Sequence, residues 1–154
     1  MPPADYHYTE CGLDNVYLIN GFDYVDAPAG RQVKIKDIDG LHIVIGRTLI
    51  NQKENLTGKE IRFLRQEMLM SQATLAKLLQ VSEQAIHRWE KNKTGVSKPA
   101  EMLIRLLYRE HINEKVTSGL RVRLEKLADI EDSIDGSKMT LQKSAKHDWQ
   151  LAAA

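Results

Sequence analysis

The sequence predicts an α+β protein with a small β-rich N-terminal module, a five-helix domain and a short C-terminal β tail. Three observations support this class. Aromatic and β-branched segments alternate with turn residues in the first third of the chain. Capped segments with helical apolar spacing follow from residue 56, and two short apolar segments follow a polar break near the end. We therefore expect domains at 1–55, 56–131 and 132–154.

Four segments in the first third have the composition of β-strands. They are rich in aromatic and β-branched residues, and Gly, Asn and Asp separate them as turns. The segment from Gln32 also alternates polar and apolar residues, as in a strand with one buried face. The expected strands are Tyr6–Thr9, Val16–Ile19, Phe22–Val25 and Gln32–Lys36. From Asp37 the apolar spacing becomes helical, which predicts a helix over residues 38–53, the last element of this module.

The middle of the chain combines helix caps with helical apolar spacing. Thr57 and Glu60 form a capping-box pattern, because each can satisfy a backbone N–H at the start of a helix. Serines precede the next helices, and a proline marks the first turn of the fourth. The helices are expected after Thr57, Ser71, Ser82 and Ser97, with a fifth at 116–130. The fourth is expected to bury Met102, Leu103, Leu106 and Leu107.

The C-terminal tail contains two short apolar segments after a polar break at 132–137. They are Met139–Gln142 and Trp149–Leu151. Each is too short for a helix, and both contain residues that favour strands. We expect them to form a hairpin or an edge strand.

Composition indicates a soluble globular protein. Hydrophobic residues make up 42% and charged residues 28% of the 154 residues, which is the usual balance of such proteins. No apolar run approaches the roughly 20 residues that span a bilayer, and the first residues lack the pattern of a signal peptide. Cys11 is the only cysteine, so no intrachain disulfide can form. These features predict a cytoplasmic protein with no membrane partner.

The charge distribution singles out the middle segment. Residues 57–113 carry 10 Lys and Arg against 6 Asp and Glu, a net charge of +4, whereas residues 1–56 carry 5 against 8, a net charge of −3. Basic side chains displace counterions from phosphates when they bind nucleic acid. The middle segment is therefore suited to a polyanionic partner.

No catalytic or metal motif stands out. The chain has no phosphate-binding loop, dinucleotide fingerprint or HExxH pair. His7 and Cys11 are a conceivable base and nucleophile, but their position near the terminus favours a coincidence. A structural zinc needs four ligands, and His7, Cys11 and His42 do not form a spaced set. We expect no enzymatic activity, no metal and no cofactor.

Residues 71–90 resemble the helix-turn-helix of the Xre and phage-repressor class. Ala76 is small enough for two helices to cross closely, Val81 is expected to fill the core inside the turn, and Ile86 anchors the second helix. The resemblance extends over about 50 residues, from the helix with Arg65 through the helix that starts near Pro99. It implies that the second helix enters the major groove of DNA. Within this frame Trp89 belongs to the core, and Glu90 pairs with Arg65.

The resemblance and the chemistry of the side chains assign the DNA contacts. Arg88 can bond guanine and Gln84 adenine, and their i, i+4 spacing directs both into the groove together. Gln72 matches a glutamine that the family uses at the DNA backbone. Helix N-termini attract phosphate, so Ser82 can act there as well as cap its helix. His87 meets a phosphate or is an ordinary surface histidine. The full set is Gln72, Ser82, Gln84, His87, Arg88, Lys91 and Lys93.

The N-terminal segment resembles a second family. Residues 6–18, followed by Gly40-Leu41-His42 and then the helix-turn-helix, are similar to the MqsA-type antitoxins. That resemblance implies a toxin-binding N-terminal domain and a C-terminal dimer that represses its own operon. Relatives with a zinc ribbon carry two CxxC pairs, whereas this chain has Cys11 alone. The module is therefore expected to lack zinc, which weakens the analogy to toxin binding.

These observations predict a nucleoid-associated homodimer that binds double-stranded operator DNA and represses transcription. The favoured setting is a toxin–antitoxin operon, with a toxin protein as a candidate partner. The alternatives are a stand-alone Xre-type regulator whose N-terminal module senses a ligand, and a protein-interaction module with a degenerate helix-turn-helix. The stripe of Val116, Leu120, Leu124 and Leu127 is the expected dimer contact, unless it packs back onto its own chain.

Overall fold

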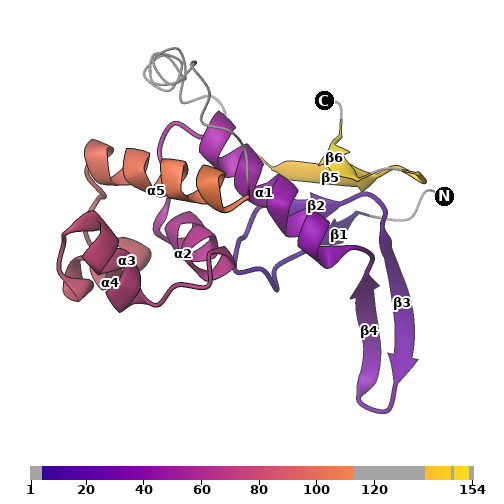
Figure 1. Cartoon of the computed structure of the whole chain (residues 1–154). Coiled ribbons are helices and arrows are strands. Elements are labelled where there is room, and N and C mark those ends of the chain that lie inside the picture. The colour runs from indigo at the N-terminus through magenta and orange to yellow at the C-terminus, as the bar shows by residue number, and fades with distance from the viewer. Residues whose placement is uncertain (1–4, 113–137, 147, 153–154) are drawn as a thin grey trace. The chain divides into compact units, whose positions relative to one another are not determined.

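The computed structural model describes residues 5–112, 138–146 and 148–152. Helices and short strands occupy separate parts of the chain, which confirms the α+β class (Figure 1). The described residues form two compact units. The first contains those of Met1–Ile45 and Gly136–Ala154, and the second those of Gly46–Asp135. The expected helix at 116–130 lies outside the described residues. In the described ranges no helix has the length and apolar character needed to cross a membrane.

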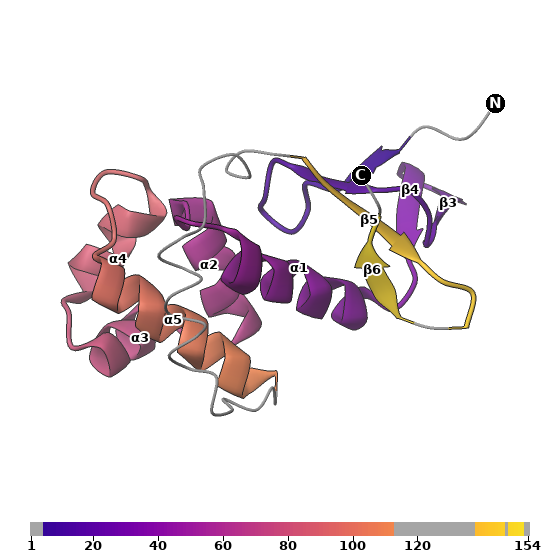
Figure 2. The same ribbon diagram turned by 90° about the horizontal axis from the view of Figure 1, so that it is seen from above.

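Both ends of the chain contribute to one sheet in the first unit. Its strands, in spatial order, are β1 (Tyr6–His7), β2 (Val16–Leu18), β5 (Met139–Lys143) and β6 (Trp149–Leu151). β2 and β5 are parallel, with Val16 opposite Met139, and the outer pairs are antiparallel. Figure 2 shows β5 and β6 beside the N-terminal strands. β6 is the edge strand expected in the tail, whereas β5 lies inside the sheet.

Two further strands of the first unit form a separate ribbon. β3 (Phe22–Ala27) and β4 (Gly30–Ile35) are antiparallel and pair over their whole length. A two-residue turn at Pro28-Ala29 joins them. The ribbon extends away from the four-stranded sheet (Figure 1). Most of its residues are exposed, and none of them is buried.

Trp149 anchors the core of the first unit. Its indole N–H donates to the carbonyls of Lys36 and Asp37, at 3.0 and 3.1 Å. Its ring lies where a side chain at Gly21 would project, and Gly21 also has a φ of 81° that favours glycine. The start of α1 (Ile38–Gln52) follows directly. A residue of the expected tail therefore fixes the turn before the ribbon and the entry to the first helix.

Four helices follow α1 in the second unit. They are α2 (Gly58–Glu67), α3 (Gln72–Leu79), α4 (Glu83–Glu90) and α5 (Lys98–His111). Each begins after the expected cap, because the side-chain oxygens of Thr57, Ser71, Ser82 and Ser97 all accept a backbone N–H three residues later. The capping box of Thr57 and Glu60 is complete. The helix boundaries predicted from caps are thus confirmed.

The buried face of α5 differs from the prediction. We expected Met102, Leu103, Leu106 and Leu107 to form its core face, but Leu103 is 45% exposed and the other three are half-buried. The helix instead buries Ala100, Glu101, Ile104, Arg105, Tyr108 and Arg109. The number of apolar residues on a face did not decide which face of α5 is buried. The buried face instead carries a hydrogen-bond donor for backbone carbonyl groups that would otherwise lack a partner.

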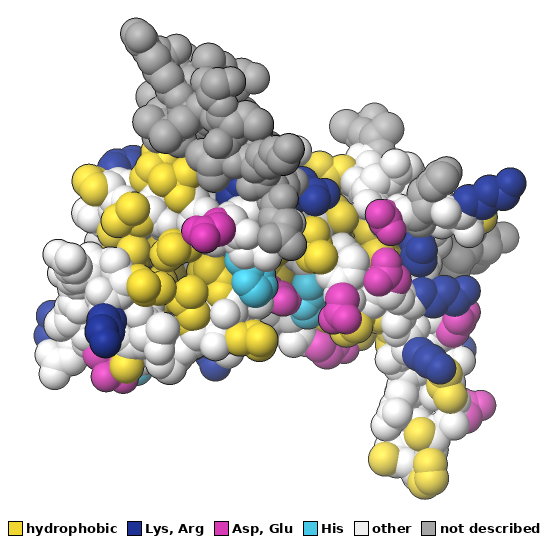
Figure 3. Space-filling model, in the orientation of Figure 1, with side chains coloured by type: hydrophobic (Ala, Val, Ile, Leu, Met, Phe, Trp, Pro, Cys, Tyr) yellow, Lys and Arg dark blue, Asp and Glu magenta, His cyan; other side chains and the backbone are white. Residues whose placement is uncertain are grey.

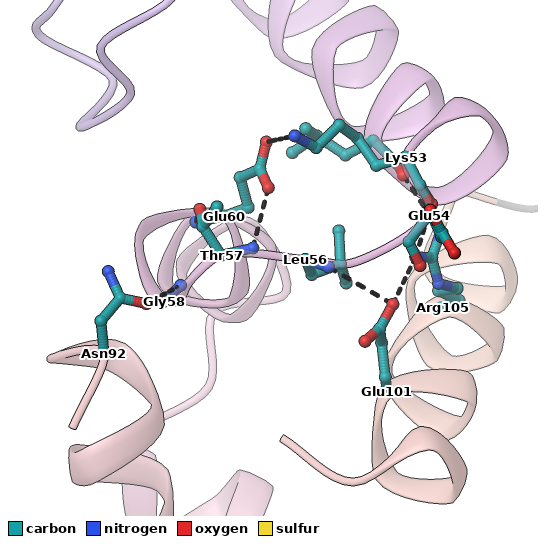
Figure 4. Close-up of polar contacts among 10 residues, drawn as sticks. Lys53, Glu54, Leu56, Thr57, Gly58, Glu60, Asn92, Glu101 and Arg105 are labelled. Carbon is teal, nitrogen blue, oxygen red and sulfur yellow. Dashed lines mark hydrogen bonds and ion pairs between the residues drawn. The ribbon is translucent and has the colours of Figure 1, made fainter. Parts of the chain in front are cut away.

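Arg105 explains this orientation. Its guanidinium is buried and donates to four carbonyls at the end of α1 and just beyond it, those of Leu49, Ile50, Lys53 and Glu54, at 2.7–3.1 Å. The last carbonyls of a helix have no partner within the helix. Arg105 also bonds the buried carboxylate of Glu101, which accepts the N–H of Leu56 (Figure 4). One side chain therefore fixes the connection between α1 and α2.

The start of α2 is held by a second set of polar contacts (Figure 4). Glu60 accepts the N–H of Thr57 at 2.9 Å and pairs with the buried ammonium of Lys53 at 3.7 Å. The Asn92 side chain accepts the N–H of Gly58 at 2.8 Å. A side chain at Gly58 would overlap the carbonyl oxygens of Trp89 and Glu90. The N-terminus of α2 is therefore closely packed against the end of α4.

Candidate nucleic-acid interface

Helices α3 and α4 form a helix-turn-helix. Gln80, which ends α3, adopts a left-handed conformation with a φ of 57° and a ψ of 44°. The N–H of Val81 then donates to the carbonyl of Ala76 at 3.0 Å, which closes the turn. Ser82 caps α4 by accepting the N–H of Ala85 at 3.1 Å. A glycine is commoner at such a left-handed position, so Gln80 is a departure that sequence inspection did not indicate.

Apolar residues between the helices set the angle of the motif. Leu75 and Ile86 are fully buried, and Ala76 is 4% exposed, so α3 and α4 approach closely at a small side chain. Trp89 is 8% exposed and belongs to the core, as expected. Val81 is half-buried in the turn. The predicted core of the motif is therefore confirmed at Ala76, Ile86 and Trp89, whereas Val81 is covered only in part.

A buried carboxylate ties three helices together. Glu90, at the end of α4, accepts two hydrogen bonds from Arg65 of α2, at 2.6 and 2.9 Å. The amide of Gln72, in the first turn of α3, donates to the same carboxylate at 3.1 Å. Arg65 also donates to the carbonyl of Met70 in the intervening loop at 2.9 Å. The expected pair of Glu90 and Arg65 is confirmed, and it fixes α4 on α2 and α3.

The opposite side of α4 is polar and exposed. Gln84, His87 and Arg88 all lie in solvent, as does Glu83 in the first turn. Gln84 and Arg88 are four residues apart, so they lie on the same face of the helix. The structure thus brings the expected base-contacting residues together on one surface, with His87 beside them.

The loop after α4 carries the two expected lysines. Lys91 and Lys93 are both exposed. Between them, Asn92 has a left-handed conformation with a φ of 57°, and its side chain bonds Gly58 as described above. The backbone N–H of Lys93 donates to the carbonyl of Arg88 at 2.9 Å. The lysines therefore project from a loop whose backbone is fixed, next to the outward face of α4.

Gln72 has a role that the sequence did not reveal. Its side chain is partly buried, and its amide is engaged with Glu90 rather than directed only to solvent. Sequence reasoning also missed Asn92, which orients the lysine loop, and Arg105, which fixes the entry to the domain. Asparagine adopts the left-handed backbone conformation more readily than most residues, so its presence after the recognition helix was the available sequence signal for Asn92. A basic residue inside an amphipathic helix gave no comparable signal for Arg105.

The residues considered for zinc or catalysis have other partners. His7 lies 2.6 Å from the carbonyl of Asp14, and His42 lies 2.7 Å from the hydroxyl of Tyr8. The Cys11 thiol donates to the carbonyl of Tyr8 at 3.6 Å. Among the residues that the structure describes, no cluster of His, Cys, Asp and Glu has the arrangement of a metal site.

Comparison with protein families agrees with this geometry. A family model described as helix-turn-helix matches residues 61–106. The second unit therefore carries a helix-turn-helix domain. The match runs from α2 into α5 and includes the whole motif, which supports a DNA-binding regulator of the Xre type. Neither the curated proteins nor the solved structures contain a match to this chain.

Proposed function

We propose that this protein is a transcriptional repressor that recognises operator DNA with the exposed face of α4. The observation that carries the proposal is the contrast between the two sides of this short helix. Ile86, Trp89 and Glu90 fix its inner side, while Gln84 and Arg88 remain exposed on the outer one. A recognition helix needs both properties, because its base contacts depend on a rigid position in the major groove.

The chemistry of the exposed residues supports sequence-specific contacts. Arg88 has the planar donor pair that matches guanine O6 and N7, and Gln84 can both donate to and accept from adenine. Ser82, His87, Lys91 and Lys93 surround them with groups suited to phosphate. Gln72 is proposed to act partly by positioning, since its amide holds Glu90 at the end of the recognition helix. Nucleoid association would follow from this binding.

The test is selection of bound sequences from random double-stranded DNA, followed by affinity measurements. Arg88→Ala is expected to weaken binding to the selected sequence by about 1–3 kcal/mol and to relax the preference at one base pair per half-site. Lys77→Ala, a change of an exposed residue on α3 outside the proposed contacts, is the matched control. Equal affinities of wild type and Arg88→Ala for the selected sequence would contradict the proposal.

Salt dependence separates the phosphate contacts from the base contacts. Lys91→Ala is expected to weaken binding to all sequences about equally, and to reduce the slope of log affinity against log salt by about one. Arg88→Ala should change the preferred sequence more than the slope. If Lys91→Ala leaves the slope unchanged, the lysine lies outside the interface.

We also propose that the repressor acts as a homodimer. One recognition helix covers few base pairs, and twofold-related helices bind half-sites about 34 Å apart. The half-exposed apolar face of α5, which includes Leu103, is a candidate contact in addition to the expected helix at 116–130. Apolar side chains gather over α5 in Figure 3. Deleting residues 114–154 is a poor test, because it removes both β5 and β6 from the four-stranded sheet. A point substitution on α5 avoids this damage.

The narrower proposal is an antitoxin that represses its own operon. It is supported by the resemblance of residues 6–18 to the MqsA-type antitoxins and by the location of these residues in a unit of their own, apart from the helix-turn-helix. The test is to express the adjacent gene with and without this protein. Growth arrest that this chain relieves, together with a stable complex of the two proteins, would support a toxin partner.

Two other outcomes would lead to the alternative functions. If the adjacent gene is harmless and a small molecule alters operator affinity, a ligand-sensing regulator is the better description. If no DNA sequence is selected, the second unit serves protein interaction alone. Each result depends on a different measurement, so the three functions can be told apart.

A further inference from the structure

We propose that the free edge of β4 binds a partner protein by accepting one of its extended segments as a third strand, and that this segment is amphipathic and acidic. The site comprises Arg31, Val33, Lys34 and Ile35 of β4, with Lys36 directly after it. It lies in the first unit and uses no residue of the helix-turn-helix. DNA binding and strand addition can therefore be tested independently.

The ribbon is an incomplete sheet. Within the described residues, β3 and β4 pair only with each other. Two-stranded ribbons are marginally stable in water, and unpaired strand edges readily accept another strand. Tyr24 is 49% exposed and Val25 45% exposed, on opposite faces of the same strand. The ribbon thus presents both a free backbone and uncovered apolar side chains.

Hydrogen-bond alternation identifies the free backbone groups. The N–H of Lys36 donates to the carbonyl of Gly21 at 2.9 Å, so this pair is of the hydrogen-bonded kind. Antiparallel pairs alternate between bonded and non-bonded positions. With the observed register, the N–H and C=O groups of Arg31, Val33 and Ile35 are therefore directed away from β3. Three residues of β4 offer a regular set of donors and acceptors to an incoming strand.

The two faces of the ribbon have different chemistry. One face carries the cross-strand pairs Phe22–Ile35 and Tyr24–Val33, with the Phe22 and Tyr24 rings 5.8 Å apart. The guanidinium of Arg31 lies 4.3 Å from the centre of the Tyr24 ring, which extends this face toward the tip. The other face carries Lys34 opposite Asp23, with Lys36 beyond it on the same side and 3.6 Å from the Asp23 carboxylate, so two ammonium groups share one carboxylate. An added strand therefore needs apolar residues on the first face and acidic residues on the second.

The charges of the two strands indicate that the added strand comes from a different protein and not from a second copy of this chain. The outer strands carry opposite charge, since Asp23 and Asp26 lie on β3 while Arg31 and Lys34 lie on β4. A twofold pairing of β4 with β4, or of β3 with β3, would join two strands that carry net charge of the same sign, which repel each other. Pairing of β3 with β4 of another copy has no twofold axis and does not close. A complementary acidic strand meets β4 without either problem.

The test uses the full-length protein labelled with 15N and two capped hexapeptides, EVEVEV and KVKVKV. The acidic peptide is expected to shift the amide signals of Arg31, Val33 and Ile35 in a saturable way. The basic peptide should shift them less. Val33→Pro removes an outward N–H that the ribbon itself does not use, so the hairpin can remain. It is expected to reduce the affinity for the acidic peptide by about tenfold, the equivalent of one lost main-chain hydrogen bond.

Two further variants keep the result interpretable. Asp26→Pro, at the residue opposite Arg31, alters the edge of β3 instead, and it should leave binding of the acidic peptide at β4 within about threefold of wild type. If Val33→Pro disturbs the ribbon, the double change Lys34→Gln and Lys36→Gln replaces it, because it removes both positive charges without placing a like charge opposite Asp23. This variant should abolish the preference for EVEVEV over KVKVKV, while unchanged binding to selected DNA shows that the second unit is intact.

Three results would overturn the proposal. The first is the absence of any saturable shift up to the solubility limit of the peptides. The second is a shift at Phe22, Tyr24 and Asp26 that the β4 variants do not alter, because this would locate binding on β3. The third is self-association that sedimentation detects in wild type and that Val33→Pro abolishes, since the occupant would then be a second copy of this chain.

Discussion

Helices α4 and α5 bury opposite kinds of surface. α4 buries Ile86 and Trp89 and exposes Gln84 and Arg88, as an amphipathic helix is expected to do. α5 buries charged residues, among them Arg105, and leaves Leu103 45% exposed. The comparison shows that hydrophobic periodicity finds a helix but does not always find its inner face. A helix with two possible inner faces turns toward the one that satisfies buried backbone groups.

The two outward faces also favour different partners. The exposed face of α4 is polar and lies next to a basic loop, which suits a nucleic acid. The exposed face of α5 is apolar, and apolar side chains gather over this helix in Figure 3. Large exposed apolar patches mark protein contacts more often than they mark nucleic-acid contacts. Substitutions on α4 and α5 can therefore separate what each helix contributes to stability and to binding.

The largest expected effect is on the buried charge of α5. Arg105→Met should lower the free energy of unfolding by about 3–5 kcal/mol, because it leaves the Glu101 carboxylate and four carbonyls without their donor. Arg88→Met, a change of an exposed arginine on α4, should alter stability by less than about 0.5 kcal/mol. Urea unfolding measures both variants.

A double variant sharpens this result. If the cost of Arg105→Met arises from an unpaired charge, then adding Glu101→Met should restore part of the lost stability. If the double variant is no more stable than Arg105→Met alone, the carbonyl bonds at the end of α1 account for the effect.

An intermediate effect is expected where α1 meets α5. Gly46 lies in the middle of α1, and a methyl group there would overlap the ring and hydroxyl of Tyr108, which is 1% exposed. Gly46→Ala should therefore cost about 1–3 kcal/mol, although alanine is the better helix former. Gly95→Ala is the control, because a methyl group there meets nothing within 4 Å. Similar thermal shifts for both variants would argue against close packing at Gly46.

The smallest effect on folding is expected on the exposed face of α5. Leu103→Lys should change the unfolding free energy of the monomer by less than about 0.5 kcal/mol. It should weaken self-association, as sedimentation at several concentrations would show, and so weaken binding to a full operator more than to a half-site. Leu78→Lys, at a residue of α3 that is 50% exposed, is the matched control. A Leu103→Lys protein that dimerises like wild type would exclude this face as the contact.

Local signals in the sequence were sufficient for most of the fold. The caps at Thr57, Ser71 and Ser82 depend on residues three positions apart, so they can be recognised without tertiary information. The strands of the ribbon and the core of the helix-turn-helix were predicted for the same reason. The ion pair of Glu90 with Arg65 was also expected, but from the family resemblance rather than from spacing.

The features that escaped prediction depend on distant parts of the chain. Arg105 bonds carbonyls more than 50 residues earlier, and β5 joins β2 across more than 100 residues. Nothing in the local pattern of α5 distinguishes an inner face with Arg105 from one with Leu103. Likewise, the alternation of Met139–Gln142 predicts a strand but not its neighbour. Long-range polar contacts and sheet order are therefore the parts that needed the structure.

The position of β5 between β2 and β6 has a consequence during protein synthesis. The ribosome releases the N-terminal strands first, yet their sheet lacks its inner strand until Met139–Lys143 has emerged. The helices of the helix-turn-helix lie entirely between these two events, and they contact one another. A nascent or prematurely terminated chain would therefore complete the helix-turn-helix before the four-stranded sheet. Such a fragment would also lack Trp149, which donates to the carbonyls of Lys36 and Asp37 at the base of the ribbon, so the ribbon would be less firmly held than in the finished protein.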